Sequence, residues 1–378
     1  MTQKTCGFAW LRRIVAVVAI ALAVFLFIQN RNLRGEIDDL EDSGTVAMGE
    51  VATQSEERPA ETGQTTRETV LVRGRLIVGG NSALPGFGAL DASTGEYAGF
   101  DIDFGRAIAA ALGVDMEVVP LTAGERFTAL QTGQVDVLIR NTTWTVTRDS
   151  KDVAADFGPT TFYDGQGFIV RKADGIQSIM DLDGATVCVT SGTTTEGNLA
   201  DAFREKGLDL TTQVFSETEA SFGAYVSGAC DCFTSDKSQL ASLRTTAANP
   251  EDHMILPDTI SKEPLGPLTR HGDDEWADIV RWVVYATFFA EEHGITQANV
   301  QTLESQNPEV RRFLGLEGGL GAKIGLAEDW AVQVIAAVGN YGEIYDRHFG
   351  SDELSIPRAG SLNDLWTRGG LIYAPAWR

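Results

Sequence analysis

The sequence predicts an α/β protein with two lobes that are joined by two crossing strands. From Val70 onward, short apolar runs alternate with helical patterns, and this order occurs in two successive units. A further apolar segment near residues 256–268 returns the chain from the second unit to the first. Because strands that alternate with helices favour parallel pairing, we expect a parallel, doubly wound sheet in each lobe.

The first unit alternates three strands with two helices. We expect strands at residues 75–78, 116–119 and 135–139, and helices at residues 99–113 and 125–132. Gly113 and Gly133 are expected to stop these helices. Asp101 and Asp103 lie at the start of the first helix, where acids usually cap the helix and offset its dipole.

The second unit repeats this order and is followed by a helical C-terminal part. Its strands are expected at residues 185–189, 213–215 and 231–234, and its helices at 193–206 and 217–227. Helical periodicity is strong again at residues 276–289 and 330–338. We therefore divide the chain into two lobes, the first with a C-terminal extension: residues 70–167 plus 259–378, and residues 168–258.

The N-terminus has the composition of an export signal. Basic residues precede a run from Ile14 to Ile28 that contains no charged or polar residue. No small-residue cleavage site follows directly, so residues 1–30 are expected to be a signal anchor, with a cleaved signal peptide as the alternative. An anchor over residues 8–28 would leave the bulk of the chain outside the cytoplasm. Residues 31–69 are acidic and poor in bulky side chains, which predicts a disordered linker.

Charge and cysteine content narrow the classes of function. The chain has 53 acidic and 30 basic residues, and this excess of acids disfavours binding to nucleic acid or to anionic lipid. Cys188, Cys230 and Cys232 lie in the part expected outside the cytoplasm, so one disulfide and one free thiol are the simplest arrangement. With four His and no Cys-x-x-Cys motif, neither a zinc site nor another cofactor is expected.

Two loops and one acid are candidates for a ligand site, because ligands of open α/β sheets bind beyond the carboxyl ends of strands. Residues 140–148 offer amide and hydroxyl groups together with Arg148, which suits a planar carboxylate. The alternative is a Thr-rich helix cap with Arg148 in a surface ion pair. In the second unit, Thr193 and Glu196 fit a capping box, which needs no ligand. Asp236 is placed to bind a cationic group, or else to cap a helix.

Several motifs, taken in order, resemble one family. They include Gly99-Phe100-Asp101-Ile102-Asp103, Asn141-Thr142-Thr143-Trp144-Thr145, Ser191-Gly192-Thr193-Thr194-Thr195-Glu196 and Gly369-Gly370-Leu371-Ile372-Tyr373. Over residues 70–378 the chain is similar to the general L-amino acid-binding proteins of polar amino acid ABC importers. The resemblance implies a type II periplasmic-binding (Venus flytrap) fold that closes on a free L-amino acid and delivers it to the permease.

The same resemblance implies a binding role for the head group of the ligand. Arg148 would bind the α-carboxylate, assisted by Thr143 and Thr194. Asp236 would bind the α-ammonium group, with Asn141 nearby.

Further residues join the expected site by resemblance. Thr193 lies in the same loop as Thr194, and Leu84 and Phe87 would place an apolar or aromatic surface over the ligand. Arg126 would approach the ligand side chain and favour glutamate, aspartate or their amides. The alternative for Arg126 is an arginine that faces solvent from a helix.

The resemblance also implies a disulfide between Cys188 and Cys230, with Cys232 as the buried thiol. We expect a monomer that binds its ligand without catalysis. Two alternatives are an enzyme on the same fold, like the dehydratases, and a co-receptor for a separate sensor.

Overall fold

A computed structural model of the protein describes residues 64–350 and 354–378. The anchor predicted over residues 8–28 and the linker up to residue 63 lie outside the described residues and stay predictions. Within the described ranges, none of the helices has both the length and the apolar character needed to span a bilayer. The prediction of a linker as far as residue 69 is wrong, because Thr65 and Glu68 form a capping box that starts helix α2, Thr66–Arg73.

The first sheet has the strand order β5-β1-β6-β15-β7. These strands are β1 Arg75–Gly80, β5 Asp115–Pro120, β6 Val137–Leu138, β7 Ala155–Phe157 and β15 Leu268–Arg270. Helices α3 Phe100–Leu112 and α4 Arg126–Gln131 connect its parallel strands. A small antiparallel sheet follows β1 and consists of β2 Ala83–Leu84, β3 Gly88–Asp91 and β4 Glu96–Ala98.

The second sheet has the order β11-β10-β12-β9-β13. These strands are β9 Gln166–Arg171, β10 Thr186–Thr190, β11 Thr211–Phe215, β12 Cys232–Asp236 and β13 His253–Ile255. Its α-helices are α5 Thr194–Lys206, α6 Thr218–Val226 and α7 Lys237–Arg244. Short 3-10 helices cover Lys172–Asp174, Ile179–Leu182 and Pro250–Asp252.

Both sheets are mixed, so the prediction of fully parallel sheets is only partly right. In each sheet three strands pair in parallel, with β1 between β5 and β6 and β10 between β11 and β12. Antiparallel pairs complete each sheet. In the first sheet, β15 pairs antiparallel with β6 and β7, and in the second sheet, β9 pairs antiparallel with β12 and β13. The reason is that a chain that crosses to the other sheet and returns enters each sheet in the reverse direction.

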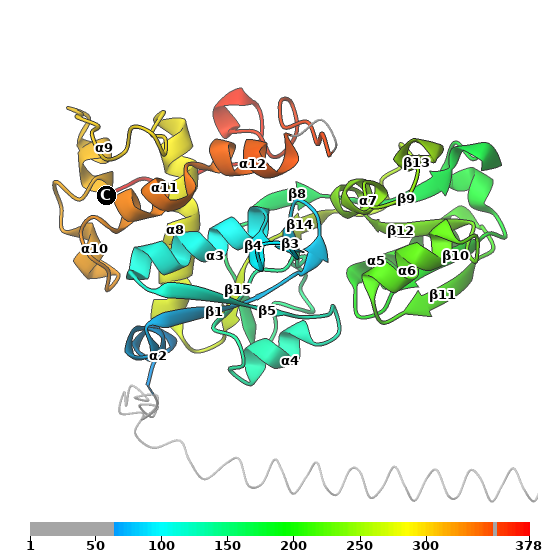
Figure 1. Ribbon diagram of the computed structural model, residues 1–378, viewed down its shortest axis with the longest axis horizontal. Helices are drawn as coiled ribbons and strands as arrows, with labels where there is room; N and C mark the ends of the chain where they lie inside the picture. The colour runs from blue at the N-terminus through cyan, green and yellow to red at the C-terminus, as the bar shows by residue number, and fades with distance from the viewer. Residues whose placement is uncertain (1–63, 351–353) are drawn as a thin grey trace, which may run out of the picture. The chain divides into compact units, whose positions relative to one another are not determined.

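Two short strands form the connection between the sheets. β8, Phe162–Asp164, leads into β9 of the second sheet, and β14, Glu263–Leu265, leads back into β15 of the first (Figure 1). They pair antiparallel, with Glu263 directly opposite Asp164. The two crossing strands predicted from the sequence are therefore present.

The C-terminal part packs on the helices of the first sheet. It consists of α8 Asp274–Glu292, α9 Pro308–Phe313, α10 Leu320–Lys323, α11 Trp330–Val338, α12 Tyr341–Phe349 and a 3-10 turn at Trp366–Arg368. Helix α11 lies against α3 and α8 (Figure 1). Close to the C-terminus, Trp377 is buried against the rings of Phe289, Phe313 and Trp330. Burying such rings contributes much of the stability of this part.

The start of α3 depends on a close approach that only glycine allows. Gly99 has φ 148°, and a Cβ there would lie 2.1 Å from the carbonyl oxygen of Phe87. The backbone N–H groups of Phe100 and Asp101 donate to the carbonyls of Gly86 (2.8 Å) and Phe87 (3.0 Å). The loop before β3 therefore caps the helix through its backbone, and the predicted capping by the side chains of the first acids is wrong.

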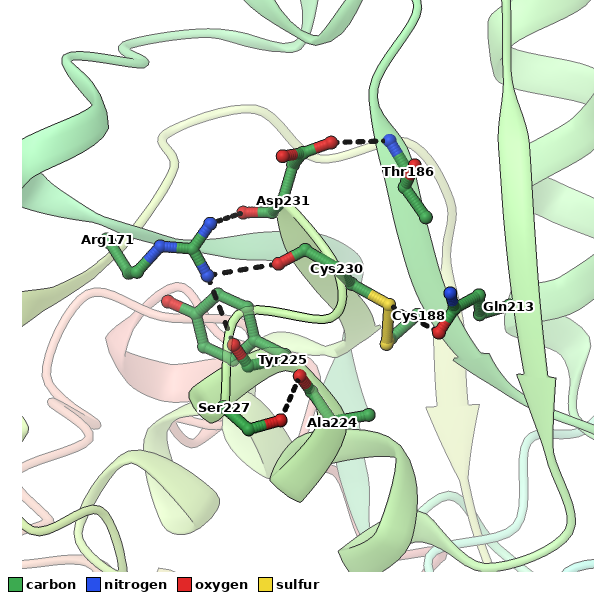
Figure 2. Close-up of a disulfide and its surroundings, with 9 residues drawn as sticks. All are labelled: Arg171, Thr186, Cys188, Gln213, Ala224, Tyr225, Ser227, Cys230 and Asp231. Carbon is green, nitrogen blue, oxygen red and sulfur yellow. Dashed lines mark hydrogen bonds between the residues drawn. A yellow bond between two sulfur atoms is a disulfide. The ribbon is translucent and has the colours of Figure 1, made fainter.

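A disulfide joins Cys188 of β10 to Cys230, which precedes β12, as the resemblance implied. Figure 2 shows Arg171 beside this bridge, where it donates to the carbonyls of Cys230 (3.0 Å) and Tyr225 (3.1 Å). Cys232 is a buried free thiol, and burial raises its pKa. The bridge closes a loop of the second sheet whose ends are 42 positions apart in the sequence.

Replacing both bridged cysteines, Cys188→Ser with Cys230→Ser, should lower the free energy of unfolding by about 4 kcal/mol, because the unfolded chain regains the entropy of a loop of this length. Urea unfolding followed by circular dichroism measures this. Cys232→Ala is the matched control. It should lower the free energy of unfolding by only about 1 kcal/mol, because it removes one small buried group. Equal losses in both variants would contradict the structural role of the bridge.

Candidate functional site

A cavity of about 330 Å³ lies where strands of both sheets end. Its lining comes from residues that follow β5 and β6 of the first sheet and β10 and β11 of the second, and from the end of β12 with the start of the next helix. The carboxyl ends of strands are where α/β folds bind ligands. The lining is predominantly polar and consists of Ala123, Arg126, Arg140, Asn141, Thr143, Arg148, Thr193, Thr194, Thr195, Thr218, Ser235, Asp236 and Gln239.

Arg148 is buried in the wall of this cavity. Only 8% of it is exposed, it donates from Nη1 to the carbonyl of Thr143 at 3.1 Å, and its guanidinium lies over the ring of Phe127. The alternative of a surface ion pair is therefore wrong. Burial lowers the pKa of Arg148, whereas the charges of Glu263 and Asp236 raise it, and arginine keeps its charge at neutral pH.

Asp236 lies at the end of β12, directly before α7. Its side chain makes no capping hydrogen bond, so the alternative of a helix cap is wrong. The carboxylate is buried, and its Oδ1 atom has no hydrogen-bond partner among the described residues. Burial, together with the charges of Asp164 and Glu263, raises the pKa of Asp236 well above its usual value, and Arg148 opposes this. A cationic group in the cavity would stabilise the ionised carboxylate.

Arg126 faces the same cavity from the start of α4. It is 3% exposed, its Nη2 atom is 3.3 Å from the carbonyl oxygen of Gly192, and its Nε atom has no partner among the described residues. The alternative of an arginine that faces solvent is therefore wrong. Burial and the nearby charges of Arg148 and Arg140 lower the pKa of Arg126 well below its usual value. Three guanidinium groups thus meet one carboxylate in the lining, and the cavity favours anions.

Asn141 adopts a backbone conformation that is uncommon outside glycine, with φ 28°. Its N–H donates to Oδ2 of Asp101 at 2.7 Å, and its side-chain oxygen accepts from Asn81 at 2.9 Å. Asp101 therefore holds the loop after β6 in place. Burial raises the pKa of Asp101 to about 7, although the bond from Asn141 and the charge of Arg140 lower it.

Two acids of the crossing strands hold the second-sheet side of the cavity. Glu263 accepts from the hydroxyl of Thr194 at 2.9 Å and from the amide of Asn198 at 2.7 Å. Asp164 accepts from the N–H of Ser238 at 3.1 Å, and burial raises the pKa of Asp164 to about 6. Because the hydroxyl of Thr194 donates to Glu263, the donor left for a ligand carboxylate is its backbone N–H, in the first turn of α5.

The structure brings together seven of the nine residues expected to bind the ligand, and two expectations for this region are wrong. Leu84 and Phe87 are buried away from the lining, since Phe87 packs on the rings of Phe162 and Phe349. The capping box at Thr193 is not formed, because its hydroxyl bonds to the carbonyl of Thr190 at 2.6 Å instead.

Comparison with known proteins supports the fold. Residues 76–300 match the bacterial extracellular solute-binding proteins, family 3. The chain belongs to this family. Its match covers both crossing strands and every residue that lines the cavity.

Individual relatives match most of the chain. The glutamate/glutamine/aspartate/asparagine-binding protein BztA of Rhodobacter capsulatus is 52% identical over 318 residues, 83% of this chain and 93% of BztA. The general L-amino acid-binding periplasmic protein AapJ of Rhizobium johnstonii is 51% identical over 321 residues, 83% of this chain and 93% of AapJ. A periplasmic binding protein from Brucella ovis with glutathione bound is 47% identical with a TM-score of 0.81, and the match covers 84% of this chain and all of that chain.

Several residues of the site were missed in the sequence. Arg140 and Gln239 line the cavity, whereas Asp101, Asp164 and Glu263 support it from behind. Asp101 belongs to a pattern that also fits an ordinary helix start. Asp164 and Glu263 lie in short crossing strands, and only the pairing of those strands shows that the half-buried Asp164 lies opposite the buried Glu263.

Asp101→Asn tests the raised pKa. Asparagine can still accept from Asn141, but it cannot ionise. Between about pH 3.8 and 7, the folded wild type keeps a proton on Asp101 that the unfolded chain has lost, so the free energy of unfolding falls as pH rises. Relative to the variant, the free energy of unfolding of the wild type should fall by up to about 4 kcal/mol over this range, and it should fall no further above pH 7. Urea unfolding at several pH values measures the difference, and a constant difference would contradict the raised pKa.

Proposed function

We propose that the protein captures free L-amino acids, acidic and polar ones foremost, for an ABC importer. The observation that carries this is a pair of buried, opposite charges with unpartnered atoms in one cavity: Nε of Arg126 and Oδ1 of Asp236. Buried charges are stable only when they are paired. An acidic amino acid supplies a side-chain carboxylate for Arg126 and an ammonium group for Asp236 within one small molecule, and so matches both.

The head group of the ligand fits between the two sheets. Its α-carboxylate binds Arg148, the hydroxyl of Thr143 and the free N–H groups in the first turn of α5, since a helix N-terminus favours an anion. Its α-ammonium group binds Asp236. Contacts to both sheets at once favour a closed arrangement of the lobes, and the ligand shifts the population toward it.

The side chain of the ligand points toward Arg126 and Arg140. Both guanidinium groups are more than 90% buried, so their charges are poorly screened by solvent. Glutamate and aspartate present a second carboxylate there, and their amides present a carbonyl oxygen. Lysine and arginine would add a cation beside two others, which the cavity disfavours.

The relatives support this ligand class and the partner. BztA is named for binding glutamate, glutamine, aspartate and asparagine, and AapJ for binding L-amino acids in the periplasm. The protein therefore acts outside the cytoplasm and passes its ligand to the transmembrane subunits of an importer. The glutathione of the Brucella ovis protein begins with a γ-glutamyl group, whose free amino and carboxyl groups suit the same head-group contacts.

Binding without catalysis is the simpler role for this lining. Its charged groups are three arginines and one carboxylate, and each has a place in binding a zwitterion. A dehydratase-like enzyme would need a general acid or base aimed at the reacting atom. We assign Asp236 to the ammonium group, which leaves no such base in the lining.

The head-group contacts predict two variants that lose binding. Arg148→Ala and Asp236→Ala should each lower the affinity for glutamate by at least about 30-fold, because each removes one partner of a buried charge pair. Isothermal titration calorimetry of refolded, ligand-free protein with all twenty L-amino acids measures the affinities. Wild-type protein that gives no heat with any amino acid would contradict the ligand class, provided circular dichroism shows that it is folded.

Arg126→Gln tests selectivity for the side chain. Glutamate and aspartate should lose at least about 10-fold in affinity, whereas the affinities for alanine and serine should change little, because their short side chains do not reach this guanidinium. The matched control is Arg204→Gln, an exposed arginine of α5 that pairs only with Asp201 on the same helix. An equal loss for every amino acid would show that Arg126 does not select the side chain.

A further inference from the structure

A second cavity adjoins the first and is larger, with about 440 Å³ against 330 Å³. The two share Ala123, Arg140 and Thr218 in their walls. The remaining lining lies on the far side of these residues and consists of Asn81, Ser82, Pro120, Leu121, Thr122, Ser216, Glu217 and Glu219. None of these three shared residues is one of the head-group contacts proposed above.

Arg140 is the group that both cavities have in common. It is 7% exposed, and its Nε atom donates to the carbonyl of Leu121 at 2.6 Å. Its two terminal nitrogens have no hydrogen-bond acceptor among the residues that the structure describes. Burial lowers the pKa of Arg140 to about 10, while Glu219, Asp101 and Glu217 raise it, so the group is a cation at neutral pH. A buried guanidinium with free donors is suited to a carboxylate.

The chemistry of the second cavity favours a peptide-like group over a cation. Glu217 and Glu219 are exposed at its rim, where solvent screens their charges, whereas Arg140 is buried. Inside the cavity, the poorly screened charge of Arg140 therefore acts more strongly than the charges of the two exposed acids. Beside Arg140, Ser82 offers a hydroxyl group that can bond to an amide.

We propose that this second cavity binds an extension joined to the side-chain carboxyl of a bound glutamate, as in γ-glutamyl amides and γ-glutamyl peptides. The extension passes between Ala123 and Thr218, and its terminal carboxylate binds Arg140. The inference rests on the proposed function, because the head group must first bind at Arg148 and Asp236.

The test compares glutamate with γ-glutamylglycine by isothermal titration calorimetry. Both should bind the wild-type protein. Ser216 lines only the second cavity and is exposed. Ser216→Trp should therefore lower the affinity for γ-glutamylglycine at least about 30-fold, while the affinity for glutamate changes less than about 3-fold. The matched control, Ser216→Ala, should leave both affinities within about 3-fold. Binding of γ-glutamylglycine that Ser216→Trp leaves unchanged would overturn the proposal.

A ratio within one variant tests Arg140 independently of folding. γ-Glutamylmethylamide keeps the γ-amide but lacks the terminal carboxylate of γ-glutamylglycine. In Arg140→Gln, the preference for γ-glutamylglycine over γ-glutamylmethylamide should fall at least about 10-fold. An unchanged preference overturns the assignment of Arg140. Binding of glutamate without γ-glutamylglycine overturns this inference alone, and binding of neither ligand overturns the proposed function with it.

Discussion

The site depends on two acids of the crossing strands. Asp164 and Glu263 lie directly opposite each other on β8 and β14. Asp164 accepts from Ser238 at the start of α7, and Glu263 accepts from Thr194 at the start of α5. Carboxylates stabilise helix N-termini, where unpaired N–H groups collect. The two strands that connect the sheets therefore also fix the two helices whose first turns face the cavity.

The same acids set the electrostatics of binding. They lie behind Asp236 and raise its pKa, whereas Arg148 and Arg126 lie in the lining and oppose them. Negative charge on one side of the cavity thus faces positive charge on the other. A zwitterion whose ammonium group points to the acids, and whose carboxylates point to the arginines, matches this field. Desolvated charges interact more strongly than exposed ones, so the match matters more here than the number of hydrogen bonds.

The features that could be predicted are those whose sequence pattern lies within a short stretch of the chain. Alternating apolar runs and glycine stops are local, and they predicted the parallel strands and the helices between them. Arg148 and Asp236 lie in motifs that resemble a family, so their place in the cavity could be expected. Asp101 and its partner Asn141 are 40 positions apart, and Glu263 reaches a residue 69 positions away, so neither contact shows in a local pattern. The antiparallel edges of the sheets were missed for the same reason.

Direct contacts between the two sides of the cavity are long, which makes closure depend on the ligand. Nη2 of Arg126 is 3.3 Å from the carbonyl oxygen of Gly192, and the hydroxyl oxygens of Thr143 and Thr194 are 3.5 Å apart. Hydrogen bonds at these distances are weak. They contribute little against the cost of bringing Arg148 and Asp236 out of water without counter-charges. A ligand that carries both charges offsets this cost on both sides at once. A carboxylate alone, or an amine alone, offsets only one side, so recognition of the zwitterion and closure of the lobes are the same electrostatic event.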